Sequence, residues 1–281
     1  MRDLSPWAVA AVEHVARSIA GPPVDPALRV TLNFHPDRHH DGIPILVAMA
    51  AAGTYRNQFE TGTSNGGLTA YPGGNRWTWE RRIFGGAYDE APAEERPEYG
   101  ALNHRSSSVG GAPRFGSAHL RLAPHTLTRT TFCYPDSVFE PENFGTETHL
   151  ALADLADADW VDGVTEDLDN YIEAHVHGVV DIASDVEALV LDPAFRGTTV
   201  EHDATELPCP VEWHDGFGAD LDTVRAHPDY RGQHIVDLAA AIAVDDRLDP
   251  AVIGAAVASG RHDPQDLKRV WHYLARFGRP S

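Results

Sequence analysis

The sequence predicts an α+β fold in which a mixed, mostly antiparallel β-sheet core carries helices at both ends of the chain. An amphipathic helical pattern opens the chain, short alternating segments fill its middle, and helical periodicity returns after about residue 230. The chain has 281 residues, of which 42% are hydrophobic, so it can bury a sizeable core. We expect a domain over residues 1–200 and a helical extension over residues 201–281 packed on the same domain.

The N-terminal elements have clear boundaries. Residues 5–20 predict an amphipathic helix, with a serine as N-cap, a proline at the first helical position and a Gly-Pro-Pro stop. Residues 28–34 alternate apolar and polar side chains as a strand does, and this strand leads directly into His35. Residues 43–52 predict a short buried helix, which Gly53 closes.

The later elements follow the same two periodicities. Short strands are predicted over residues 99–104, 114–122, 128–134 and 169–182, the last with a glycine kink. Helices are predicted over residues 148–160 and in three stretches after residue 230, bounded by Asp-Pro pairs or glycine. Residues 184–192 fit either a strand or a short helix, which Pro193 ends.

Residues 53–90 differ in kind from the rest. They combine many glycines with aromatic side chains, among them Tyr55, Tyr71, Trp77 and Trp79. Flexible linkers lack aromatic residues, and long irregular loops inside a compact domain are usually functional. We therefore expect a long functional loop here.

Composition excludes several classes of protein. The 42 acidic residues outnumber the 22 basic ones, and a net charge of -20 argues against a generally basic nucleic-acid-binding surface. Two cysteines cannot form a disulfide scaffold. No stretch approaches about 18 uninterrupted apolar residues, the length that spans a membrane. We expect a cytoplasmic protein without a membrane partner.

One short motif matches the nucleophile elbow of serine hydrolases. Residues 62–66 have the pattern G-x-S-x-G, with Ser64 as the nucleophile. That motif needs a hydrophobic strand before it and a helix after it, but polar residues precede this one and Gly67 and Pro72 follow. A serine hydrolase is therefore an alternative, and a glycine-rich loop is the simpler interpretation.

A second cluster lies on the predicted strand 169–182. Alternate strand residues face the same side, so Tyr171, Glu173, His175 and His177 should share one face. Two imidazoles on one face can bind one metal ion, which makes a metal-dependent hydrolase a further alternative. Burying the Glu173 carboxylate is costly, so it is exposed, paired or catalytic.

Taken in order, these segments resemble the ADP-ribosyltransferase superfamily, and more closely a bacterial family of uncharacterised proteins grouped with it. The resemblance covers residues 28–200 and has three landmarks. They are the strand that ends at His35, the segment 53–65 with its aromatic and Ser/Thr residues, and the late strand that presents Glu173. Tyr171 stands where arginine-modifying members have a second Glu or Gln, so an arginine acceptor is not implied.

The resemblance implies a split β-sheet core and an enzyme that cleaves the nicotinamide–ribose bond of NAD and transfers ADP-ribose to an acceptor of unknown class. Glu173 would stabilise the transition state, His35 would contact the ribose and Tyr55 would stack on nicotinamide. The other expected NAD contacts are Arg38 at the pyrophosphate, Gly53, Ser64, Asn65 and Tyr71. The reaction needs no metal. Residues 71–86 are expected to recognise the acceptor or to close over NAD.

Two questions stay open at this point. Glu187 follows on the next segment and competes with Glu173 for the catalytic role, although the turn at Gly178 favours Glu173. A non-catalytic module that binds NAD without turnover is the third alternative to the transferase.

Overall fold

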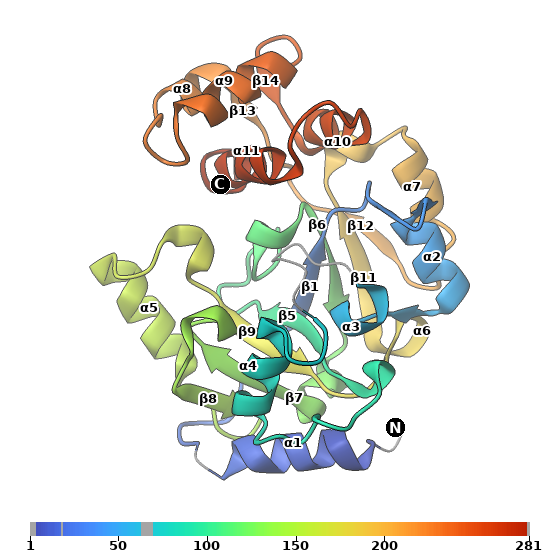
Figure 1. The fold of residues 1–281 in the computed structure, drawn as a ribbon, viewed down its shortest axis with the longest axis vertical. Coiled ribbons are helices and arrows are strands. Elements are labelled where there is room, and N and C mark those ends of the chain that lie inside the picture. The colour runs from blue at the N-terminus through green and yellow to red at the C-terminus, as the bar shows by residue number, and fades with distance from the viewer. Residues whose placement is uncertain (1–3, 18, 63–69, 280–281) are drawn as a thin grey trace.

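An eight-stranded sheet runs through the molecule, and its strand order is β12-β11-β6-β1-β5-β9-β7-β8 (Figure 1). The computed structural model describes residues 4–17, 19–62 and 70–279. The sheet strands are β1 (Val30–Phe34), β5 (Glu98–Leu102), β6 (Ala118–Leu122), β7 (Thr130–Tyr134), β8 (Asn143–Thr146), β9 (Ile172–Val176), β11 (Val186–Leu191) and β12 (Val211–Trp213). Only β11 and β12 pair in parallel among these neighbours, which confirms an α+β fold with a mixed, mostly antiparallel sheet.

Short two-stranded ladders accompany the main sheet. They pair β2 (His39–His40) with β3 (Ile43–Pro44), β4 (Thr54–Tyr55) with β10 (Val180–Asp181), and β13 (Ala219–Asp220) with β14 (Arg247–Leu248). The β4–β10 ladder ties the segment after α2 to the segment after β9, although more than 100 residues separate them in the chain.

The helices lie around the sheet and at its two ends. They are α1 (Pro6–Ala16), α2 (Ile45–Ala52), α3 (Gln58–Thr61), α4 (Asn75–Ile83), α5 (Leu152–Asp162), α6 (Ile182–Asp185), α7 (Thr199–Ala204), α8 (Leu221–Arg225), α9 (Gln233–Ile242), α10 (Pro250–Ala258) and α11 (Pro264–Phe277). Helices α8 to α11 gather at one end of the molecule and α1 crosses the opposite end (Figure 1). None of the helices in the described part of the chain has the length and apolar character needed to cross a bilayer.

The expectation that residues 53–90 form one long irregular loop was wrong. Helix α4 occupies the middle of this segment, with Gly74 as its N-cap, and it buries Glu80 and Ile83. Helix α3 precedes it, with Asn57 and Glu60 forming a capping box. The frequent glycines conceal these helices in the sequence because they flank the helices rather than interrupt them.

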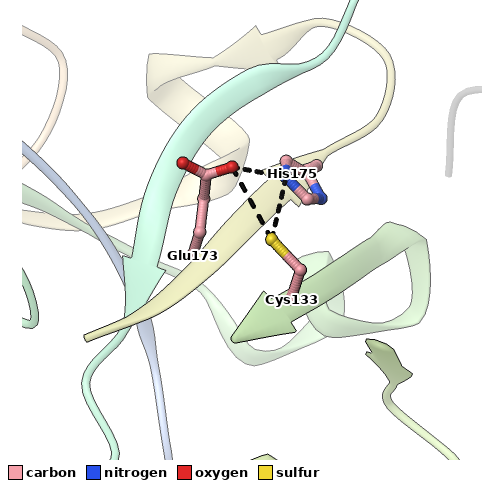
Figure 2. Close-up of side chains that lie close together, drawn as sticks. All are labelled: Cys133, Glu173 and His175. Carbon is pink, nitrogen blue, oxygen red and sulfur yellow. Dashed lines mark hydrogen bonds and ion pairs between the residues drawn. The ribbon is translucent and has the colours of Figure 1, made fainter. Parts of the chain in front are cut away.

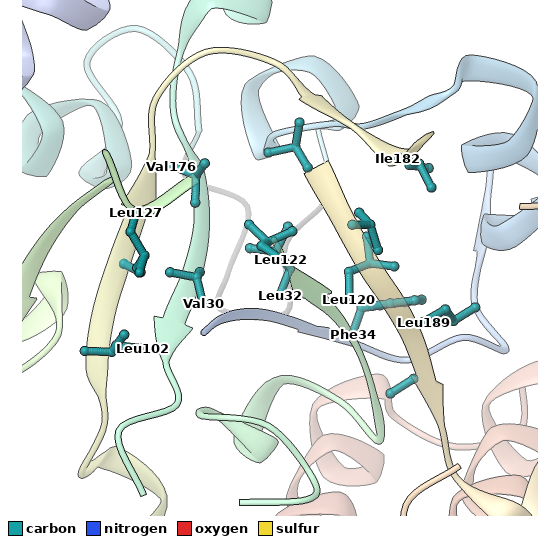
Figure 3. Packing of buried hydrophobic residues seen from close by; sticks show 14 of the residues in the cluster. Val30, Leu32, Phe34, Leu102, Leu120, Leu122, Leu127, Val176, Ile182 and Leu189 are labelled. Atoms are coloured by element: carbon teal, nitrogen blue, oxygen red, sulfur yellow. The ribbon is translucent and has the colours of Figure 1, made fainter. Parts of the chain in front are cut away.

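The main hydrophobic core packs on one face of the sheet. Val30, Leu32 and Phe34 of β1 point into it, together with Leu120 and Leu122 of β6 (Figure 3). Helices α2, α5 and α7 also contribute residues to this cluster. Burial of so many apolar side chains is the largest favourable contribution to folding that this chain has.

The C-terminal helices form a second hydrophobic cluster and also contact the segments that follow β1 and precede β6. Trp271 of α11 donates through Nε1 to the carbonyl oxygens of Pro113 and Arg114, each at 3.0 Å. Its ring meets the ring of His35 edge to face at 4.9 Å. Gly254 of α10 lies so close to Asp37 that a Cβ there would come within 1.5 Å of the Asp37 carboxylate. The C-terminal helices therefore hold the loop that follows β1.

Candidate functional site

A cavity of about 350 Å³ opens where β1, β4, β5 and β9 come together with α2 and α4. Its volume lies within the range typical of small-molecule sites. Asn33, Tyr55, Tyr99, Phe115 and Glu173 are among the residues that line it. These residues are far apart in the sequence, and the sheet order brings Asn33, Tyr99 and Glu173 together because β1, β5 and β9 are neighbours.

Several residues singled out from the sequence meet in this cavity. His35, Arg38, Tyr55 and Glu173 all line it, although they span almost half of the chain. The structure does not bring in Tyr71, which is 57% exposed and is not part of the lining.

The remaining expected contacts have different positions. Gly53 lies between two lining residues, where it adopts φ +68 as the C-cap of α2, and is not itself part of the lining. Its carbonyl oxygen accepts a hydrogen bond from the backbone N–H of Ile182 at 2.9 Å. Ser64 and Asn65 lie outside the described residues. The serine-hydrolase alternative therefore has no described geometry.

Glu173 lies on β9, opposite Ala101 of β5 and Cys133 of β7 in the strand register. The residue is only 5% exposed. Oε1 accepts a hydrogen bond from Nε2 of His175 at 2.9 Å, and Oε2 accepts one from the hydroxyl of Ser137 at 3.2 Å. Oε1 also accepts from the Cys133 thiol, whose Sγ lies at 3.8 Å, so donors on both oxygens fix the orientation of a carboxylate that lines the cavity.

Glu173 is ionised at neutral pH. Burial acts to raise its pKa, but the interaction with His175, the charge of Arg76 and the hydrogen bond from Ser137 outweigh burial and hold the pKa below its ordinary value. A buried carboxylate that keeps its charge is suited to stabilising positive charge that develops beside it.

Arg76 of α4 is a site residue that sequence reasoning missed. Its guanidinium lies over the ring of Tyr99 at 4.2 Å and donates to the Ser137 hydroxyl at 3.0 Å. Its Nε is buried and has no hydrogen-bond partner among the described residues. The available signal was the position of Arg76 within the aromatic segment 53–90.

The lining has an excess of positive charge in an acidic protein. Arg38, Arg56 and Arg76 line the cavity together with one carboxylate, that of Glu173. Burial lowers the pKa of His35 well below its ordinary value, and Arg38 acts in the same direction, so His35 is neutral at pH 7. A cavity lined by cationic groups attracts and holds an anionic ligand.

The two histidines of β9 and its end both contact the hydroxyl of Thr131, His175 through Nδ1 and His177 through Nε2. The other ring nitrogen of His175 is directed at Glu173, whereas that of His177 is directed at Tyr88, away from the carboxylate. Within the described residues, the one cluster with the spacing of metal ligands is Cys133, Glu173 and His175 (Figure 2). Burial raises the pKa of the Cys133 thiol well above its ordinary value, and the charge of Glu173 acts in the same direction.

Glu187 lies elsewhere. It is on β11, and its carboxylate accepts hydrogen bonds from Nε of Arg29 at 3.0 Å and Nε of Arg121 at 3.3 Å. It does not line the cavity. The geometry therefore favours Glu173 over Glu187 for any chemistry in this cavity.

Comparison with known families places the chain. It belongs to the family DUF3626, described as a protein of unknown function, whose model matches residues 29–160 and 150–277. No curated protein matches the chain. Because the two matches together reach from before β1 to the end of α11, the family pattern includes both the cavity and the C-terminal helices.

Proposed function

We propose that this protein is an ADP-ribosyltransferase, which cleaves the nicotinamide–ribose bond of NAD and transfers ADP-ribose to an acceptor. The observation that carries the proposal is the meeting of His35, Tyr55 and Glu173 in one cationic cavity. The proposal includes the finer fold assignment, a split sheet of the ADP-ribosyltransferase type with its His after β1 and its Glu on β9. The acceptor is to be sought among proteins, nucleic acids, small molecules and water.

Glu173 has the central role in this mechanism. Loss of nicotinamide builds positive charge on the ribose, and an ionised carboxylate held in place beforehand stabilises that charge without reorganising. The donors from His175 and Ser137 supply this orientation. The same carboxylate is positioned to accept a hydrogen bond from a ribose hydroxyl or a proton from the acceptor.

The other lining residues would bind the dinucleotide. The ring of Tyr55 offers a stacking surface for nicotinamide. Arg38 and Arg76 would neutralise the pyrophosphate, because guanidinium groups pair with phosphate oxygens through fixed donors. Neutral His35 would contact the ribose as a hydrogen-bonding group rather than as a charge.

A metal-dependent hydrolase is the second candidate, and the cluster of Cys133, Glu173 and His175 is the observation that favours it. This cluster takes the place of the His175 and His177 pair that the sequence predicted as metal ligands. The cluster is buried, and its Glu173 carboxylate already accepts hydrogen bonds from His175 and Ser137. We therefore rank this candidate below the transferase.

The test is nicotinamide release from NAD by the purified protein, with and without cell lysate. We expect Glu173→Gln to lower turnover by about 100-fold or more, because it removes the charge that stabilises the transition state, while NAD affinity stays within a few-fold. Glu187→Gln is the matched control and should leave release unchanged.

Three other outcomes would contradict the proposal in distinct ways. NAD binding without any release indicates a binding module. No release, together with stoichiometric zinc and a chelator-sensitive hydrolase activity, supports the metal candidate. Loss of release in Glu187→Gln but not in Glu173→Gln moves the reaction away from the cavity.

A further inference from the structure

A continuous series of hydrogen bonds runs through the protein interior behind Glu173. The Tyr88 hydroxyl lies 2.7 Å from Nδ1 of His177, and Nε2 of His177 lies 2.9 Å from Oγ1 of Thr131. The same Oγ1 is 3.1 Å from Nδ1 of His175, whose Nε2 is 2.9 Å from Oε1 of Glu173. All five side chains are buried.

The chemistry of the last member sets the direction of the series. An ionised carboxylate only accepts hydrogen bonds, so Nε2 of His175 carries a proton and donates to Glu173. In a neutral His175, Nδ1 must then accept, and its donor is the Thr131 hydroxyl. The oxygen of Thr131 in turn accepts from Nε2–H of His177. Nδ1 of His177 finally accepts from the hydroxyl of Tyr88.

The opposite direction leaves a buried donor unsatisfied. If His175 were doubly protonated, Nδ1–H would donate to Thr131, the hydroxyl would donate to His177, and Nδ1–H of His177 would donate to Tyr88. The Tyr88 hydroxyl hydrogen would then need another acceptor, and His177 is its only partner among the described residues. Tyr88 is 1% exposed, so leaving this donor unpaired is costly.

Aromatic rings hold the two imidazoles in place. Phe84 meets both His175 and His177 edge to face at 5.2 Å. Tyr99 also meets His175 edge to face at 5.2 Å. The rings come from the C-cap of α4 and from β5, so the sheet and its covering segment both restrain the series.

We infer that His175 is a positioning residue for Glu173, held in its donating tautomer by a one-way series of hydrogen bonds through Thr131 and His177 from Tyr88. The inference rests on the proposed function, since Glu173 is there the group that meets the ribose. His175 binds the carboxylate from the interior and acts through it rather than on NAD. Removing a member of the series should therefore slow the chemical step and leave NAD binding nearly unchanged.

The first experiment needs no activity. Nitrogen-15 labelling of histidine, read by two-bond nitrogen–proton correlations at pH 7, reports which ring nitrogen carries the proton. We expect His175 and His177 both to be neutral and protonated at Nε2, with assignments made from His175→Gln and His177→Gln. A proton on Nδ1 of either histidine overturns the inference, whether or not the protein releases nicotinamide.

The second experiment measures kcat and KM for nicotinamide release in paired variants. Hydrogen bonds to charged groups are worth enough for His175→Leu to lower kcat by about tenfold or more. His175→Gln keeps an N–H donor and should recover part of this loss. Thr131→Val removes the central hydroxyl and should lower kcat by about fivefold, whereas Thr131→Ser should stay near wild type.

Thr130→Val is the matched control for loss of stability. Thr130 is the neighbouring buried residue on β7, and its hydroxyl donates to the carbonyl oxygen of Thr126 at 2.8 Å, away from the series. We expect Thr130→Val to lower the melting temperature about as much as Thr131→Val does, but without a change in kcat. Equal kcat losses in Thr130→Val and Thr131→Val would show a merely structural role and overturn the inference.

The outcomes separate the two proposals. Wild-type protein that releases no nicotinamide but shows the expected tautomers rejects the proposed function and keeps the hydrogen-bonded series. Wild-type release with unchanged kcat in His175→Leu rejects the positioning role and keeps the proposed function. If Thr131→Val does not fold, the positioning role of His175 is still tested by the wild-type tautomers and by kcat in Thr131→Ser and His175→Gln.

Discussion

Strands β1 and β9 each present two unlike faces, and both faces are buried. On β1, Val30, Leu32 and Phe34 enter the hydrophobic core, while Thr31 and Asn33 point to the opposite side. On β9, the apolar set packs into the same core, and the opposite set includes Glu173 and His175. Along each strand, residues that pack into the core therefore alternate with residues that line or support the cavity.

The two faces achieve burial by different means. The apolar face needs only complementary volume, and many side chains can share that task. The polar face must give each donor and acceptor a partner, as Thr31 does when its hydroxyl accepts from the N–H of Gly111 at 2.8 Å and donates to Asn33 at 3.2 Å. The apolar face therefore supplies stability, and the polar face supplies defined geometry.

The largest expected effect tests the apolar face. Leu32 is fully buried, so Leu32→Ala leaves a cavity and should lower the free energy of unfolding by about 3 kcal/mol. Chemical denaturation measures this loss. Nicotinamide release per folded molecule should stay close to wild type, and a loss of kcat with unchanged stability would contradict the division between the faces.

The next effect concerns pH and the polar face of β6, where His119 lies opposite Asn33 in the register. Burial lowers the pKa of His119 from 6.5 to about 3, with His214 and Arg121 acting in the same direction. Between these values the unfolded chain binds one more proton than the folded chain does. The contribution of neutral His119 to the free energy of unfolding is therefore fully present above pH 6.5 and is lost as the pH drops toward 3.

His119→Asn should remove this dependence. The slope of unfolding free energy against pH between about 4 and 6 should become shallower by about 1.4 kcal/mol per pH unit. Glu80, whose pKa burial raises to about 7, contributes a slope of opposite sign, which is common to wild type and variant and cancels in their difference. His202→Asn on α7 is the control, and an equal change of slope there would reject the assignment.

The smallest effect is expected from Thr31→Val, next to Leu32 on β1. It removes the acceptor for the Gly111 N–H and should cost about 1–2 kcal/mol of stability, less than Leu32→Ala. The segment it releases carries Ala112 of the cavity lining, so KM for NAD should rise as well. Thr31→Ser should restore both the stability and the KM for NAD. An unchanged KM in Thr31→Val would show that the segment with Gly111 and Ala112 does not affect ligand binding.

Periodicity makes part of this arrangement predictable. The alternation in residues 28–34 predicts β1, and the period of two correctly places Glu173 and His175 on one strand face. The helix predicted over 5–20 ends earlier than expected, at Ala16, and the expected strand 169–182 divides into β9 and β10 around Gly178. The helix end differs by four residues, more than the one or two residues by which frayed ends vary, so periodicity predicts the existence of these elements better than their bounds.

The contacts of the site that the sequence did not predict depend on which strands become neighbours in the sheet. β9 lies between β5 and β7, and this order brings Tyr99 and Thr131 against His175. No local pattern encodes that order, so the partners of His175 could not be inferred from its own segment. Arg76 was hidden for a different reason, since glycines around α4 suggested a loop.

The indole of Trp271 gives the C-terminal helices a further consequence. Its ring contacts His35, which lines the cavity, and its Nε1 binds the backbone at Pro113 and Arg114, so a ligand that binds more tightly to this arrangement of His35 also stabilises the attachment of α11. By linkage, detachment of α11 must weaken ligand binding by the same factor by which ligand resists that detachment. Amide hydrogens of α11 should therefore exchange more slowly when the cavity is occupied, which makes this distant helix a reporter of ligand.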